Sequence, residues 1–123
     1  MRRLTSNEAV AATQPADPQT FTGPTRNLAV ATTADAHPVR ALLVHFENGA
    51  RTHWHRHAGG QVLHVVEGRG RTQSRGGEVV ELAPGDIVTA DPGEEHWHGA
   101  ADGTAMTHLA ISIGATDWGP APD

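Results

Sequence analysis

Residues 51–61 read Arg-Thr-His-Trp-His-Arg-His-Ala-Gly-Gly-Gln, with histidine at three alternate positions. Alternate side chains leave the same face of a β-strand, so the imidazoles are expected on one face and Trp54 and Arg56 on the other. Neutral imidazole is a frequent ligand of divalent first-row metals, and the stretch therefore predicts part of a metal site. The residues concerned are His53, His55 and His57, with Gln61 four residues further on.

A second pair of histidines has the same spacing. The turn signal Pro92-Gly93 comes shortly before His96-Trp97-His98, so His96 and His98 also share one strand face. Two such pairs can supply the several nitrogen ligands that one ion needs. The alternative is that some of them are surface histidines on strand edges, in a chain that contains nine histidines.

Two longer segments resemble the paired motifs of the cupin family. Residues 49–68 are similar to the first motif, and residues 77–96 are similar to the second, with Pro84-Gly85-Asp86 in the middle and His96 at the end. The resemblance implies a single-domain, all-β fold, a small barrel of the jelly-roll or double-stranded β-helix type. It also implies one metal ion inside that barrel.

The register of the first motif is ambiguous, because both His53/His55 and His55/His57 satisfy the H-x-H pattern. Segments 54–61 and 95–100 look most like the small manganese-dependent cupins that act as hydroxynitrile lyases. Matched residue by residue, this resemblance implies the metal ligands His55, His57, Gln61 and His96, and it leaves His53 as an extra histidine. The ion is expected to be manganese or iron, with zinc or nickel as alternatives.

Gln61 departs from the commoner cupin pattern, which has glutamate at this place. An amide oxygen carries no charge, so three histidines and one glutamine would leave a divalent ion uncompensated. Such an ion should be a stronger Lewis acid and should accept an anionic ligand more readily. The alternative is that Gln61 is an ordinary polar strand residue.

Two further histidines are expected near the ion. His98 lies about 7 Å along the strand from His96, and an imidazole with an unperturbed pKa of about 6.5 can exchange protons with a substrate. The alternative for His98 is a purely structural role in anchoring a loop. By resemblance, His108 lies on the cavity face of strand 104–113, and either His98 or His108 is the expected catalytic residue that moves the proton. The implied pocket residues are Leu42, Val44, Met106 and Ser112, with Ser112 in place of a larger amide side chain of the hydroxynitrile lyases.

Length and composition limit the chain to one domain and few functional classes. The 123 residues suffice for one core, and 14 glycines and 8 prolines favour short strands and turns over helices. A net charge of −5 offers no basic surface for nucleic acid or an anionic membrane. Cysteine is absent, so any metal must use nitrogen and oxygen ligands, and a cytoplasmic location is expected. No apolar run predicts a secretion signal or a membrane span.

The barrel is expected over residues 26–114, between an N-terminal arm at 1–25 and a tail at 115–123. The arm is interpreted as loosely ordered, with a short strand at 21–23, and it is either disordered or packed across a partner subunit, as the resemblance implies. A homodimer is the default expectation. His64 is expected outside the barrel, and Trp118 either caps the barrel or contacts a partner. Strands are predicted at 27–33, 39–46, 53–57, 61–66, 71–74, 78–82, 87–90 and 104–113, and the strand at 87–90 is expected to be buried.

The resemblance implies a metal-dependent lyase that acts on a small-molecule substrate, with cleavage of a cyanohydrin to aldehyde and cyanide as the first hypothesis. Two alternatives remain open. One is an Fe(II)-dependent cupin dioxygenase, since a three-histidine site with an open position would serve it as well. The other is a non-catalytic cupin that binds a metal or a small ligand, because one fold hosts many functions.

Overall fold

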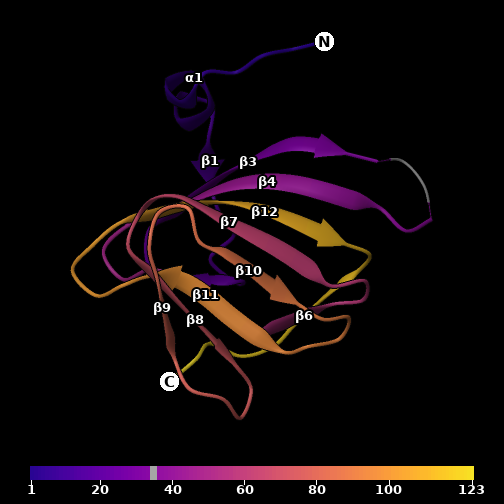
Figure 1. Ribbon diagram of the computed structural model, residues 1–123, viewed down its shortest axis with the longest axis vertical. Coiled ribbons are helices and arrows are strands. Elements are labelled where there is room, and N and C mark those ends of the chain that lie inside the picture. The colour runs from indigo at the N-terminus through magenta and orange to yellow at the C-terminus, as the bar shows by residue number, and fades with distance from the viewer. Residues whose placement is uncertain (34–35) are drawn as a thin grey trace.

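The computed structural model describes residues 1–33 and 36–123, which fold into two antiparallel β-sheets that lie face to face (Figure 1). One sheet has the strand order β1 (Gln14–Pro15), β3 (Thr25–Thr32), β4 (Val39–Phe46), β12 (Met106–Ile113), β7 (Gln61–Gly68) and β10 (Ile87–Ala90). The other has the order β13 (Thr116–Trp118), β6 (His55–His57), β11 (His96–Ala100), β5 (Arg51–Thr52) and β2 (Phe21–Thr22). In that second sheet β8 (Gly70–Ser74) pairs with β11, and β9 (Val80–Leu82) pairs with β8. The all-β jelly-roll prediction is confirmed.

Alternation decides which side of each long strand faces the interior. Along β7 buried and exposed residues alternate, with Gln61, Leu63 and Val65 inside and Val62, His64 and Val66 outside. The predicted outward position of His64 is therefore confirmed. The central strand β12 pairs with β4 along its whole length, Met106 opposite Phe46 and Ile113 opposite Val39.

The apolar core adjoins the histidines. Phe46 and Met106 are fully buried, and the Phe46 ring meets the rings of His98 and His108 at centroid distances of 6.1 and 5.2 Å. Strands from both sheets contribute to this core, because each turns one face inward. Its buried members are Val44, Phe46, Ala50, Val65, Leu82, Ala100 and Met106.

The predicted histidine strand starts only at His55, as β6, and His53 and Trp54 form a break between β5 and β6. At this break the backbone bonds with the two ends of the chain. The His53 N–H donates to the Thr20 carbonyl and the Trp54 N–H donates to the Pro120 carbonyl, each at 2.9 Å. The arm and the tail therefore satisfy the backbone where the sheet does not.

Helix α1 (Ser6–Ala11) lies within the segment that was expected to be loosely ordered. Thr5 caps it, since the Glu8 N–H donates to the Thr5 Oγ1 at 3.1 Å. Threonine followed three residues later by glutamate is a capping signature that sequence reasoning overlooked. None of the helical residues is buried, and in Figure 1 the helix stands at the top of the view, above the sheets.

The chain ends contribute strands outside residues 26–114. Strand β2, at the predicted short strand, pairs with β5, β1 pairs with β3, and β13 pairs with β6. The packing of the arm across a partner subunit stays a prediction.

Strand β10 differs from the buried strand that the sequence suggested. It is the edge strand of its sheet, and Ile87 is 68% exposed.

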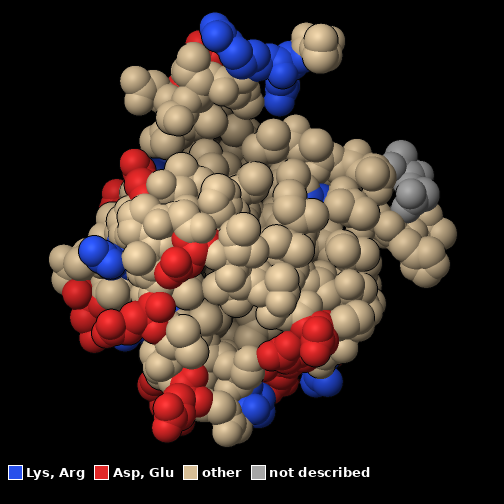
Figure 2. All heavy atoms as spheres, viewed as in Figure 1, with Lys and Arg blue, Asp and Glu red and all other residues tan. Residues whose placement is uncertain are grey.

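On the face seen in Figure 2, Asp and Glu side chains gather in patches over the lower part, and all nine basic residues of the chain are arginines. Within the described residues, no helix has the length and apolar character needed to cross a membrane.

Candidate functional site

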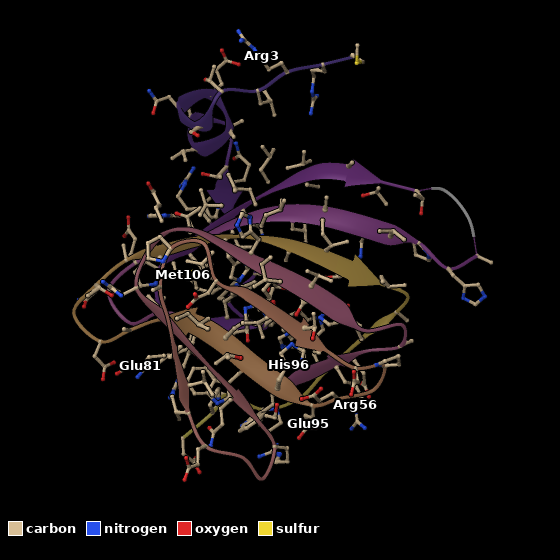
Figure 3. The ribbon with its side chains drawn as sticks, in the orientation of Figure 1. Arg3, Arg56, Glu81, Glu95, His96 and Met106 are labelled. Atoms are coloured by element: carbon tan, nitrogen blue, oxygen red, sulfur yellow. The ribbon has the colours of Figure 1, made fainter. Side chains whose placement is uncertain are left out.

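Four buried imidazoles meet between the two sheets. His55 and His57 come from β6 and His96 and His98 from the adjacent β11, with His96 paired opposite His55. The His55 ring lies 4.4 Å from that of His96, 4.9 Å from that of His57 and 5.1 Å from that of His98, measured between centroids. All four are at most 4% exposed, so the cluster is shielded from water. In Figure 3 His96 lies between the sheets, whereas Arg56 and Glu95 lie at the rim.

Gln61 reaches this cluster from the opposite sheet. Its Oε1 lies 2.9 Å from the His96 Nε2, and its Nε2 donates to the Ser112 Oγ at 3.0 Å. The bend that sets this position occurs at Gly60, whose φ is +90°. A Cβ there would lie 2.7 Å from the Ala90 carbonyl oxygen, so only glycine fits.

Outer hydrogen bonds orient the rings. The Nδ1 of His55 lies 2.9 Å from the His53 carbonyl oxygen, and the Nδ1 of His96 lies 2.9 Å from the Glu94 carbonyl oxygen. A carbonyl only accepts, so each Nδ1 carries the proton and each Nε2 presents a lone pair to the interior. Metal-binding histidines are held in this way by their surroundings. The extra histidine, His53, thus contributes its backbone carbonyl to the site.

The same bonds test whether a cation fits. Because the proton of His96 is on Nδ1, its Nε2 can only accept a hydrogen bond. This Nε2 faces the Oε1 of Gln61, which is also an acceptor. Two acceptors at this distance repel each other unless a positively charged species lies between them. The Nε2 of His57 is buried without a hydrogen-bond partner among the described residues, while its Nδ1 lies 3.0 Å from the Thr116 Oγ1. These donor atoms suit a divalent ion of the manganese, iron or zinc type.

Three of the histidines form a group that can hold a metal ion, with ligating atoms within 4.8 Å of one another. The group consists of His55, His96 and His98. Sequence reasoning placed His57 and Gln61 beside the first two and gave His98 a different role. The structure brings all five side chains together, and it puts His98 nearer to the ligand position than expected.

His98 is paired with His108. The His98 Nδ1 lies 2.9 Å from the His108 Nε2, and both side chains are buried. This leaves the His98 Nε2 and the His108 Nδ1 without hydrogen-bond partners in the part of the chain that the structure describes. The imidazole pair is a means of moving one proton, because each ring can donate or accept at the shared bond.

Burial and mutual repulsion keep these histidines neutral. Burial, followed by the neighbouring His96, lowers the pKa of His55 to about 3 and that of His57 to about 4. Burial also lowers the pKa of His108 to about 4, and that of His98 well below its usual value, where His108 adds to the effect. Neutral imidazoles are the form that binds metals and accepts protons.

The metal-free protein is expected to lose stability as the pH falls from about 7 to about 5. In the unfolded chain a histidine takes up a proton near pH 6.5, whereas His55, His57 and His108 stay neutral in the folded protein until the pH approaches about 3 to 4. Below about pH 6.5 the unfolded state therefore binds more protons and is favoured. Thermal melting in the presence of a chelator measures this effect. A melting temperature that stays level over this range would contradict the burial of neutral histidines.

A cavity of about 260 Å³ opens beside the cluster. A void of about 150 Å³ can hold a benzene ring, so this cavity has room for a small aromatic compound. The predicted pocket residues Leu42, Val44 and Ser112 line it, whereas Met106 lies in the core and His108 behind His98. Trp118 forms part of the opposite wall, and its ring packs against that of His55 in a tilted arrangement at a centroid distance of 4.6 Å.

A second cavity, of about 330 Å³, reaches the cluster from another side. Gln61 lines both cavities, and His96 lines the second one. The apolar side chains around the second cavity include Leu63, Val80 and Val88.

Comparison with known proteins identifies the family. The cupin domain model matches residues 42–112, which carry the histidines described above. The chain belongs to the cupin family. This cupin is 50% identical over 102 residues to an (R)-mandelonitrile lyase of Granulicella tundricola, with 80% of this chain and 78% of that protein covered.

Solved structures agree with this assignment. A cupin-like protein from Thermotoga maritima superposes with a TM-score of 0.82 at 36% identity, covering 87% of this cupin and 84% of that chain. The polyketide cyclase RemF from Streptomyces resistomycificus superposes with a TM-score of 0.76 at 16% identity, covering 92% of this cupin and 79% of that chain. At that identity RemF shows the shared fold alone.

Several cavity residues escaped sequence reasoning. Arg40 lies two positions before Leu42, and strand alternation could have placed both on one face. Asp17 and Phe21 of the arm and Thr116 of the tail also line the cavity. No local pattern signals them, because the chain ends reach the site only through tertiary packing.

Proposed function

We propose that this cupin is a metal-dependent lyase that splits a hydroxynitrile into a carbonyl compound and cyanide. The 50% identity to an (R)-mandelonitrile lyase over four fifths of the chain is the observation that carries this proposal. The buried histidine cluster beside a small cavity is consistent with it. A pocket with a few polar groups among apolar walls is the usual form of a small-molecule site.

We assign the metal to His55, His57, Gln61 and His96, and propose manganese or iron as the ion. The Nδ1 atoms of His55 and His96 each donate to a backbone carbonyl, which leaves their Nε2 atoms for the ion. The His57 Nε2 has no hydrogen-bond partner among the described residues, and the Gln61 Oε1 faces the His96 Nε2. A bound divalent cation would supply Lewis acidity, which stabilises negative charge on a substrate oxygen or on cyanide. Because the assigned ligands are uncharged, the cation keeps its full positive charge.

His98 is the proposed acceptor for the hydroxyl proton of the substrate. It lines the cavity, its Nε2 has no hydrogen-bond partner among the described residues, and its lowered pKa makes it neutral at pH 7. As this proton leaves, the carbon–cyanide bond breaks, the carbonyl double bond forms, and cyanide departs with the electron pair. The proton then passes from His98 to cyanide, so that hydrogen cyanide is released. His108 orients the His98 ring through their shared hydrogen bond.

The assembly and location of the protein are further parts of the proposal. We propose a homodimer, supported by apolar side chains on the outer face of the six-stranded sheet, where Val62, Val66 and Ile87 are 37%, 46% and 68% exposed. The N-terminal arm would pack across the partner, and the protein would act in the cytoplasm on a small-molecule substrate.

The reaction is tested with racemic mandelonitrile. Protein loaded with manganese or with iron is expected to release benzaldehyde and cyanide in equal amounts, and chelated protein is expected not to. Absence of release with either metal, together with oxygen consumption by the iron-loaded form, would replace the lyase by the Fe(II)-dependent dioxygenase alternative. Inactivity in both assays would favour a binding protein.

A further inference from the structure

Arg40 lies in the cavity beside the histidine cluster. It is on the inward face of β4, opposite Ser112 of β12, and Ser112 is in turn opposite Gln61 of β7. These three residues therefore form one cross-strand row, in which neighbouring Cβ atoms are about 5 Å apart. Because the middle residue is small, space remains between the guanidinium and the proposed ligand Gln61.

No carboxylate among the described residues pairs with Arg40. Its Nη2 donates to the Thr116 Oγ1 at 2.7 Å, and its Nε is buried without a partner. Other arginines of the barrel have carboxylate or carbonyl partners, although the Nε of Arg71, like that of Arg40, is buried without a partner among the described residues. Arg56, Arg71 and Arg75 form ion pairs with carboxylates, and Arg26 and Arg51 donate to backbone carbonyls.

The charges around Arg40 leave the cavity short of negative charge. The acidic residue that lines it, Asp17, forms no ion pair with Arg40, and its Oδ1 accepts the Gln19 N–H at 2.9 Å. The neighbouring histidines and Gln61 carry no negative charge, and a bound divalent ion would add two positive charges. A partly buried guanidinium in such surroundings favours an anion that completes its hydrogen bonds.

We propose that Arg40 binds a carboxylate of the substrate, so that the preferred substrates are hydroxynitriles, or the matching carbonyl compounds, that also carry a carboxylate group. The carboxylate lies over Ser112 beside Arg40, and the reacting carbon lies between Arg40 and the histidine cluster. The assignment of the reacting group as a hydroxynitrile rests on the proposed function, whereas the assignment of the carboxylate subsite rests on Arg40 and its surroundings. Arginine suits this role because its planar fork can donate two parallel hydrogen bonds to one carboxylate.

The test compares two ligands of nearly the same shape, one with a carboxylate and one with a neutral amide. Calorimetry measures the binding of 3-formylbenzoate, a carbonyl compound with a separate carboxylate, and of 3-formylbenzamide to the metal-free and to the manganese-loaded protein. The wild type is expected to bind the carboxylate roughly 10-fold or more tightly than the amide in both forms. The metal-free form is decisive, because a carboxylate can also bind the ion directly.

The Arg40→Met variant should lose this preference while its affinity for the amide stays the same. Arg56→Met is the matched control, since it removes an arginine at the rim and should leave the preference intact. Arg40→Lys keeps the positive charge but cannot donate two parallel hydrogen bonds, so its preference for the carboxylate is expected to lie between those of the wild type and Arg40→Met. Equal binding of both ligands by the metal-free wild type overturns the proposal even if no variant folds, as does a preference that survives Arg40→Met.

The two proposals fail separately. A carboxylate preference without any release of cyanide would remove the lyase reaction and keep the Arg40 subsite. Cyanide release from mandelonitrile with no carboxylate preference would keep the reaction and remove the subsite.

Discussion

The His57→Ala variant is expected to purify with about a tenth or less of the metal that the wild type carries, whereas His98→Ala keeps a nearly full complement. The His57 Nε2 is buried with no hydrogen-bond partner among the described residues, and its Nδ1 lies against Thr116. His98 instead shares its Nδ1 with His108. Elemental analysis after growth with manganese, and separately with iron, measures the difference.

The opposite outcome has an equally definite meaning. Retention of metal by His57→Ala and its loss by His98→Ala would assign the ion to His55, His96 and His98, the three histidines that lie within ligating distance of one another. Gln61→Ala should behave like His57→Ala if the amide oxygen is a ligand. His64→Ala is the control, because this exposed histidine lies on the outer face of β7.

The same His98→Ala variant is expected to lose roughly 10²- to 10⁴-fold in kcat for mandelonitrile cleavage, which is the usual contribution of a positioned general base. The reason is that His98 lines the cavity and that its proton-accepting Nε2 has no hydrogen-bond partner in the described chain. Initial rates of benzaldehyde release give the measurement, normalised to bound metal. Normalisation separates a lost proton acceptor from a lost ion.

His108 provides a second comparison for this prediction. His108→Ala removes the partner that orients the His98 ring, so a smaller fall in kcat and a changed pH profile are expected. The control is again His64→Ala, with unchanged rates. Wild-type rates in His98→Ala at full metal occupancy would exclude His98 from proton transfer.

The four-histidine cluster was predictable because the information is local. H-x-H spacing puts His55 with His57 and His96 with His98 on common strand faces, and the structure brings both pairs together by pairing β6 with β11. The inward positions of Leu42, Val44 and Ser112 were implied by the resemblance to the cupins, because the strand that carries Leu42 and Val44 is apolar on both faces. Period-two patterns survive folding wherever a strand has one buried face.

The features that sequence reasoning missed depend mainly on contacts between residues far apart in the chain. The division of the histidine strand depends on bonds from Thr20 and Pro120, which lie far away in the chain. Met106 fills the core instead of the cavity because it lies opposite Phe46 at the start of β12. Helix α1 had a local signal in Thr5 and Glu8, but the prolines of the arm argued against regular structure.

The walls of the cavity differ in how firmly the fold holds them. Ala110 and Ser112 belong to β12, which is hydrogen-bonded along both edges to eight-residue strands. Phe21 and Trp118 belong to β2 and β13, strands of two and three residues formed by the chain ends. In hydrogen exchange, amides of β12 should open only with the whole barrel, and those of β2 and β13 by local fraying at far lower free energy. Substrates can then enter by displacing β2 and β13, while the wall formed by β12 keeps its shape.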